Sequence, residues 1–171
     1  MRKCRESDIE FDFSNALQVF KHDTTVSNCE GDSIAEGNTV WPGVDFRIED
    51  SDGEIWIEVK NWRGTKGKRN YLSKMKSRSF AEEMRAKFLG TTAFLAWNGN
   101  FRKALLHYAL LFESHPKADP CLLGPFNDLL RSQLPIPNRL EIKVFVMNLE
   151  KWNQKYPEYP SKKTYKGNPG N

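Results

Sequence analysis

The chain has 171 residues, of which 39% are hydrophobic and 12% aromatic, and its 26 basic and 22 acidic side chains give a formal charge of +4. This length suits one ordinary domain and this apolar content suits a hydrophobic core, which excludes a wholly disordered chain. The longest apolar stretch, residues 105–112, is far shorter than the roughly 20 residues that span a bilayer. We therefore expect a globular protein that has no membrane partner.

The cysteines Cys4, Cys29 and Cys121 are odd in number and do not have the spacing of metal ligands. The first residues include basic side chains but lack the apolar segment of a secretory signal. These observations predict reduced thiols and a cytoplasmic protein.

The positive charge is concentrated between residues 61 and 80, in a segment that we call the cationic strip. The strip contains no acidic residue, and outside it the remaining 19 basic side chains compare with 22 acidic ones. Its basic residues are Arg63, Lys66, Lys68, Arg69, Lys74, Lys76 and Arg78. Such a strip either keeps a loop soluble or contacts a polyanion, because phosphate contacts release condensed counterions.

In chain order, residues 7–20 come first and are predicted to form a helix, because apolar residues recur at helical spacing and Ser7 and Glu10 match a capping box. A polar loop is expected over residues 23–40. Residues 43–49 and 54–60 alternate apolar and polar side chains around an Asp-Gly dipeptide, which predicts a β-hairpin.

Residues 79–89 carry a second capping box and an apolar stripe, and Gly90 follows, so we expect a helix that ends there. The further expected elements are a buried strand over residues 91–97, helices over 101–112 and 125–134, and a strand over 140–148. The expected fold class is α/β, with a mixed central sheet and helices on both faces. We expect one domain over residues 1–150 and a basic tail over 151–171 that is mobile at its end.

The predicted hairpin brings three charged residues together. A two-residue turn places Asp45 opposite Lys60, whereas a four-residue turn places it opposite Glu58. In both registers Asp45, Glu58 and Lys60 lie on one face, because strand side chains alternate with a period of two. The other face is expected to be apolar and to carry Val44, Phe46, Ile48, Ile55, Ile57 and Val59.

Two carboxylates within one cross-strand step can share a divalent cation, which prefers oxygen ligands, and the Val59 carbonyl is expected near the same point. Such a cation can activate a water and neutralise charge on a scissile phosphate, while Lys60 orients that water or stabilises the transition state. These residues suit metal-dependent phosphodiester hydrolysis. The simplest alternative is a cross-strand salt bridge between Asp45 and Lys60 in an unrelated α/β protein.

The segment Pro42-Gly43-Val44-Asp45, followed by Glu58-Val59-Lys60, resembles the motif of the PD-(D/E)XK nuclease superfamily. The resemblance covers residues 6–97, since the family core runs helix, three-stranded meander, helix and strand. It implies a restriction-endonuclease-like core in which Asp45 and Glu58 bind Mg²⁺ or Mn²⁺ and Lys60 assists catalysis. The chain has Pro-Gly-Val-Asp where the family has Pro-Asp.

The family often adds a glutamate from the first helix, which implies a catalytic role for Glu10. The other role open to Glu10 is the capping box with Ser7, and Glu6 and Asp23 are competing acidic residues. The cationic strip begins directly after the motif, at the sheet edge where a phosphate would lie. The residues expected to bind nucleic acid there are Arg63, Lys66, Lys68, Arg69 and Lys74.

Together these features predict a cytoplasmic Mg²⁺-dependent nuclease that hydrolyses phosphodiester bonds in DNA. The alternative in another class is a nucleic-acid-binding or assembly protein with the same fold, whose charged triad forms a structural ion pair. A homodimer is expected if both strands of a duplex are cut, because this needs two active sites. No base-reading motif is visible, so DNA and RNA, and duplex, single-stranded and branched substrates, all stay open.

Overall fold

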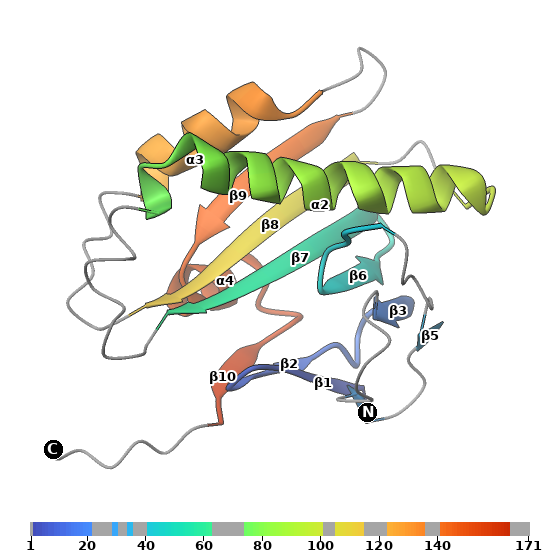
Figure 1. Cartoon of the computed structure of the whole chain (residues 1–171). Helices are drawn as coiled ribbons and strands as arrows, with labels where there is room; N and C mark the ends of the chain where they lie inside the picture. Colours follow the sequence, from blue (N-terminus) through green and yellow to red (C-terminus); the bar gives the residue numbers. More distant parts are fainter. Residues whose placement is uncertain are drawn as a thin grey trace, which may run out of the picture.

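The structure is a computed structural model that describes residues 2–21, 29–30, 34–35, 41–62, 74–100, 105–114, 123–135 and 141–164 (Figure 1). Within these residues the protein is α/β and consists of a six-stranded sheet, a four-stranded sheet and three helices. The α/β prediction is therefore confirmed.

The six-stranded sheet has the strand order β5-β3-β6-β7-β8-β9. Its strands are β5 (Ile34–Ala35), β3 (Gln18–Lys21), β6 (Phe46–Glu49), β7 (Gly53–Trp62), β8 (Leu105–Ser114) and β9 (Ile142–Met147). The β3–β6 and β6–β7 pairs are antiparallel, whereas the β7–β8, β8–β9 and β3–β5 pairs are parallel. The sheet is thus mixed, as predicted.

The β6–β7 pair is the predicted hairpin. Its register pairs Phe46 with Ile57 and Ile48 with Ile55. This is the register of the four-residue turn, which sets Asp45 opposite Glu58. The sequence left both registers open, and the structure selects the one that brings the two carboxylates together.

Helices cover both faces of the six-stranded sheet, as expected. Helices α2 (Arg78–Trp97) and α3 (Leu123–Gln133) lie on one face and share a core with side chains of β7, β8 and β9 (Figure 1). Helix α4 (Leu149–Lys155) and the smaller sheet pack on the other face, around side chains of β6, β7 and β8. The six-stranded sheet therefore lies between two hydrophobic cores, one on each face.

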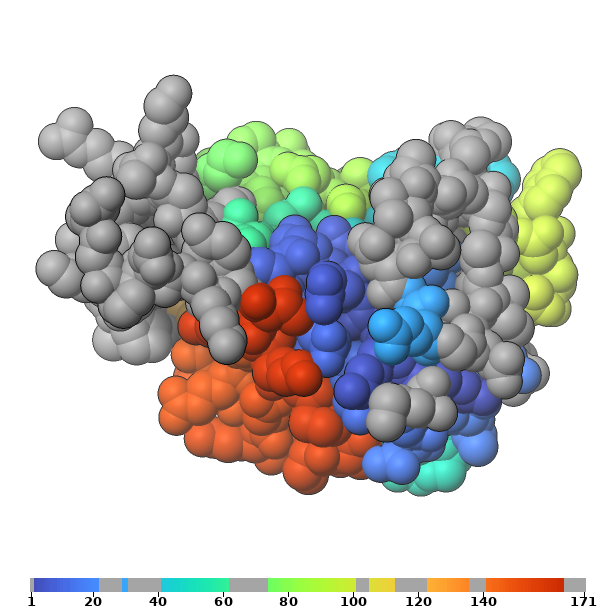
Figure 2. Space-filling view, turned by 90° about the horizontal axis from the view of Figure 1, so that it is seen from below, coloured from blue at the N-terminus to red at the C-terminus, as the bar shows by residue number. Residues whose placement is uncertain are grey.

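The smaller sheet is antiparallel and has the order β10-β2-β1-β4. Its strands are β10 (Ser161–Lys163), β2 (Ile9–Asp12), β1 (Lys3–Glu6) and β4 (Cys29–Glu30). Figure 2 shows the resulting surface, on which the blue N-terminal strands lie beside the red C-terminal segment. Trp152 of α4 and Tyr159 are fully buried beneath it. The predicted tail is therefore wrong over residues 151–164, and residues 165–171 lie outside the described part of the chain.

The predicted first helix over residues 7–20 is wrong. Residues 9–13 read Ile-Glu-Phe-Asp-Phe, and this strict alternation forms β2 with Ile9, Phe11 and Phe13 buried. Ser7 is not a helix cap: it lies in the turn between β1 and β2 with a φ of +56°. The same residues also satisfy a helical spacing, but they fold with the period of two that is typical of a strand.

The structure also corrects two elements after the hairpin. Helix α2 does not end at Gly90 but continues to Trp97, through the predicted strand 91–97. The predicted helix 101–112 is instead the strand β8 from residue 105 onward, and residues 101–104 lie outside the described part. A strand that is parallel on both sides and buried on both faces reads as a continuous apolar run, which sequence periodicity does not separate from a helix. Helix α3 and strand β9 confirm their predictions.

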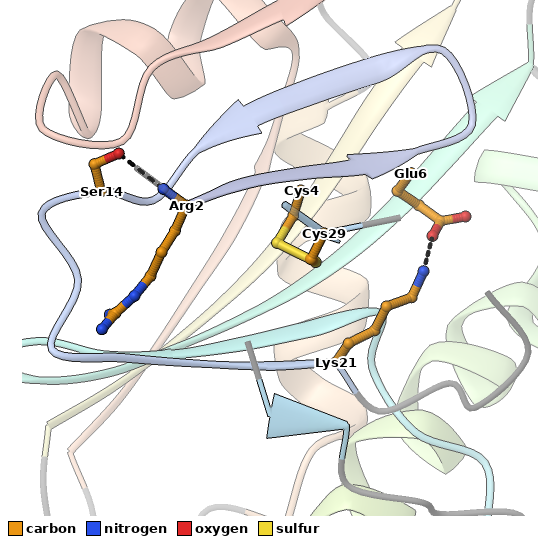
Figure 3. The surroundings of a disulfide bond; sticks show 6 residues. All are labelled: Arg2, Cys4, Glu6, Ser14, Lys21 and Cys29. Carbon is orange, nitrogen blue, oxygen red and sulfur yellow. Dashed lines mark hydrogen bonds and ion pairs between the residues drawn. A yellow bond between two sulfur atoms is a disulfide. The ribbon is translucent and has the colours of Figure 1, made fainter. Parts of the chain in front are cut away.

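Cys4 and Cys29 form a disulfide that links β1 to β4, so the prediction of reduced thiols is wrong for these two cysteines (Figure 3). Cys121 lies outside the described residues. Reduced cysteines were one of the two grounds for predicting a cytoplasmic protein, and the disulfide removes that ground. None of the helices in the described ranges is both long enough and apolar enough to cross a membrane.

Candidate functional site

Glu58 lies on β7, the strand between β6 and β8, and its side chain faces α2. Trp56 shares this face and packs on Phe88 of α2, with the ring centroids 5.3 Å apart. Because α2 covers this face, Glu58 is 0% exposed. The charged face of the hairpin is therefore covered by α2, and the Glu58 carboxylate lies inside the protein.

The segment that carries Asp45 is fastened to α2 just before β6 begins. The Val44 backbone N–H donates a hydrogen bond of 3.1 Å to Thr91 Oγ1. Val44 packs in the core beneath α2, so its predicted place on the opposite, apolar face is wrong. These contacts direct Asp45 toward β7, where its Oδ2 accepts a 2.7 Å hydrogen bond from the Val59 N–H.

Lys60 completes the group that the sequence predicted. Its Nζ lies 2.9 Å from Glu58 Oε1 and 3.1 Å from Glu83 Oε1 of α2. Val59, between Glu58 and Lys60, is buried and holds Asp45 through its amide. Asp45, Glu58, Val59 and Lys60 are thus brought together in the structure.

Two residues of α2 that the sequence reading did not single out, Glu83 and Lys87, join this group. Lys87 Nζ lies 2.6 Å from Glu58 Oε1 and 3.8 Å from Asp45 Oδ1. One signal could have found them: Glu83 and Lys87 are four residues apart and flank the buried stripe of Phe80, Met84 and Phe88. Charged residues at the edge of a buried stripe lie where the helix meets the sheet.

The pKa values of the site reflect burial first and charge second. Burial raises the pKa of Glu58 to about 7, and the charge of Asp45 adds to this, while Lys87 and Lys60 oppose it. Burial also raises the pKa of Asp45, against the charge of Lys87 and the hydrogen bond from Val59. For Lys60, burial acts to lower the pKa, but Glu58 and Glu83 outweigh it and the pKa is raised. A divalent cation would therefore stabilise the ionised forms of Asp45 and Glu58 more than the two lysines do.

The residues present fit a hard divalent cation. Both carboxylate oxygens of Glu58 are buried; Oε1 lies 2.6 Å from Lys87 Nζ and 2.9 Å from Lys60 Nζ, whereas Oε2 accepts no hydrogen bond within the described residues. Asp45, in the residue just before β6, supplies a second carboxylate. No cluster of three or more His, Cys, Asp or Glu side chains occurs in the ranges that the structure describes. Two carboxylates suit a cation that keeps several waters, such as Mg²⁺.

The other acidic candidates lie elsewhere. Glu10 is on β2, not on a helix, and its carboxylate pairs with Lys162 at 3.0 Å and Arg5 at 3.1 Å in the smaller sheet. The prediction that it joins the site from a first helix is therefore wrong. Glu6 faces Lys21, whose Nζ lies 3.6 Å from it (Figure 3), and Asp23 lies outside the described residues.

Four of the five residues predicted to bind nucleic acid lie outside the described part of the chain. Arg63, Lys66, Lys68 and Arg69 fall in residues 63–73, between β7 and α2, which lie outside the described ranges. Lys74 is exposed just ahead of α2. Its role in binding stays a prediction.

No protein family, curated protein or solved structure matches this chain. The geometry of the site therefore carries the functional interpretation.

Proposed function

We propose that this protein is a metal-dependent nuclease with a restriction-endonuclease-like core and that it hydrolyses phosphodiester bonds, most readily those of DNA. One observation carries the proposal. The β6–β7 hairpin sets Asp45 opposite Glu58, and Lys60 Nζ lies 2.9 Å from the Glu58 carboxylate. A buried carboxylate, a half-buried one and an adjacent lysine suit such a reaction.

The order of elements supports this core. The antiparallel strands β3, β6 and β7 are followed by α2 and then by β8, which is parallel to β7. This is the meander, helix and strand order that the resemblance implies, over residues 18–114 and not 6–97. No helix precedes β3 within residues 2–21, so that element of the family core has no counterpart there.

Each residue of the site has a distinct role in this proposal. Asp45 and Glu58 hold Mg²⁺ or Mn²⁺, and the Val59 carbonyl is a further oxygen ligand on the same strand. The bound ion supplies Lewis-acid stabilisation of the charge that develops on the phosphate. Lys60 orients the attacking water or stabilises the transition state, and Glu83 holds the Lys60 ammonium in place at 3.1 Å.

A second function has one observation in its favour. Lys87 already lies 2.6 Å from Glu58 and 3.8 Å from Asp45, so the carboxylates are neutralised without a metal. This arrangement suits a nucleic-acid-binding or assembly protein whose charged group is only structural. That function predicts binding by the cationic strip without cleavage.

A cleavage assay separates the two functions. Supercoiled plasmid, single-stranded DNA and RNA are incubated with Mg²⁺, Mn²⁺ or EDTA, using wild type, Asp45→Asn and Lys60→Met. We expect metal-dependent cleavage that each substitution lowers by about 100-fold or more. The matched control is Lys143→Met, which removes the lysine of another Glu-x-Lys pair, formed by Glu141 just before β9 and Lys143 on β9. If no substrate is cut, the nuclease function is wrong and the strip is next tested for binding alone.

The same assay addresses oligomeric state. A homodimer with two active sites converts supercoiled plasmid to the linear form in one binding event, whereas a monomer first accumulates nicked circles.

A further inference from the structure

Lys87 lies close to both carboxylates of the site. Its Nζ lies 2.6 Å from Glu58 Oε1 and 3.8 Å from Asp45 Oδ1, and it projects from α2. Asp45 and Glu58 are held from the sheet side by the Val59 amide and by β7 itself. One tethered cation therefore lies near a carboxylate of β7 and a carboxylate of the segment just before β6.

We propose that Lys87 is a built-in occupant of the metal position, so that its ammonium group must leave before a divalent cation can reach both Asp45 and Glu58. This inference rests on the proposed function, because it concerns the same site. It assigns to Lys87 a positioning role: the residue keeps the apo site neutral and sets how tightly the metal binds.

The geometry explains why such an occupant is needed. Unpaired carboxylates in a covered site are costly, and Glu58 is 0% exposed while facing another carboxylate. Lys60 alone cannot neutralise both carboxylates of the site, since its ammonium group is also paired with Glu83. Lys87 supplies the second positive charge from α2.

The geometry also shows how Lys87 can leave. Its side chain is 22% exposed, and Glu83, one helical turn earlier on α2, has a side chain that is 51% exposed. A lysine stem is long and flexible, so its ammonium group can move from the interior to solvent or toward Glu83 without moving the helix.

The first test measures metal affinity directly, with no nucleic acid present. Mn²⁺ binding is followed by titration calorimetry at one fixed pH for all variants. The variants are Lys87→Met, Lys87→Arg and the matched control Arg85→Met, which removes a basic residue from an exposed position of the same helix. We expect Lys87→Met to bind Mn²⁺ about tenfold more tightly, while Lys87→Arg and Arg85→Met match wild type or bind more weakly. Thermal unfolding confirms that each variant is folded.

The second test follows Lys87 in the wild-type protein. Its amine is acetylated in a short pulse, with and without Mn²⁺, and the modified sites are located by mass spectrometry. We expect Mn²⁺ to raise the labelling of Lys87 at least twofold. Lys143 on β9 is the internal reference, because it pairs with Glu141 and its labelling should not respond.

The outcomes distinguish the inference from the function on which it rests. If wild type and Lys87→Met bind Mn²⁺ equally and Lys87 labelling does not change, the inference is overturned and the nuclease function stands. If only Lys87→Met binds Mn²⁺, the inference is supported and the metal-dependent function of the wild type is overturned. If no variant binds Mn²⁺, both are overturned.

Discussion

Gly90 on α2 lies directly against the carbonyl group of Pro42, so that a Cβ added at Gly90 would be 1.8 Å from the Pro42 oxygen. This close approach of helix and loop places Val44 within hydrogen-bond distance of Thr91 and brings Asp45 to its position opposite Glu58. Gly90 thus serves the packing of α2 on the segment before β6. It does not end the helix.

We expect Gly90→Ala to lower the free energy of unfolding by about 3 kcal/mol, because the backbone of α2 or of Pro42 must shift. The gain in helix propensity, about 1 kcal/mol, is too small to offset this. Gly124→Ala in α3 is the matched control, since a Cβ there has no atom within 4 Å and the change should leave stability equal or slightly higher. Chemical denaturation measures both. Equal effects of the two substitutions would show that the Pro42 contact is not tight.

Three residues of the site could be predicted from the sequence, because the prediction depends only on the alternation of side chains within one hairpin. The period of two places Asp45, Glu58 and Lys60 on one face whichever register the turn adopts, and local sequence sets this pattern. The choice of register and the burial of Glu58 were not readable. The register depends on the turn, which the Asp50 N–H closes by a hydrogen bond to the Gly53 carbonyl, and the burial of Glu58 depends on α2, which packs against that face only after the chain has folded.

The same limit explains the errors in secondary structure. The apolar run of β8 has no period that distinguishes a strand buried on both faces from a helix, and only its neighbours β7 and β9 decide the matter. Lys87 was missed for a related reason. A lysine beside an apolar stripe is usually solvated, and its contact with Glu58 joins two residues that are 29 positions apart in the sequence.

The raised pKa of Glu58 makes stability depend on pH. The native state binds the Glu58 proton more tightly than the unfolded chain does, because the pKa rises from 4.5 to about 7. The stability linked to this proton is fully present below pH 4.5 and is lost as pH rises through about 7. Glu58→Gln has no such proton, so the unfolding free energy of wild type should fall relative to that of the variant by about 3 kcal/mol between pH 4.5 and pH 8.

This comparison is made with EDTA present and by denaturant titration at several pH values. Titrating groups that do not contact the site are common to both proteins and cancel in the difference. A difference that stays constant from pH 4.5 to pH 8 would mean that Glu58 has an ordinary pKa and is not strained by burial.

The disulfide between Cys4 and Cys29 closes a loop with a sequence separation of 25 residues. The chain-entropy model gives about 3 kcal/mol of stabilisation for a loop of this length, so reduction of wild type should lower the unfolding free energy by about this amount. Cys29→Ser should be insensitive to reductant. Alkylation in denaturant without reductant should leave Cys4 and Cys29 unlabelled, and labelling of these two would contradict the disulfide.

Trp152 of α4 shows how far the C-terminal segment belongs to the fold. Its ring is fully buried, its Nε1 donates a 2.7 Å hydrogen bond to the Tyr159 carbonyl, and it packs edge-on against Phe11 of β2. We expect Trp152→Ala to lower the unfolding free energy by about 3–5 kcal/mol, since it leaves a cavity and an unpaired carbonyl between α4 and the smaller sheet. Trp97→Ala, at a position that is 81% exposed, removes the same side chain from the end of α2 and should cost less than about 1 kcal/mol. Similar losses for the two variants, measured by chemical denaturation, would mean that residues 149–164 contribute little to the stability of the domain.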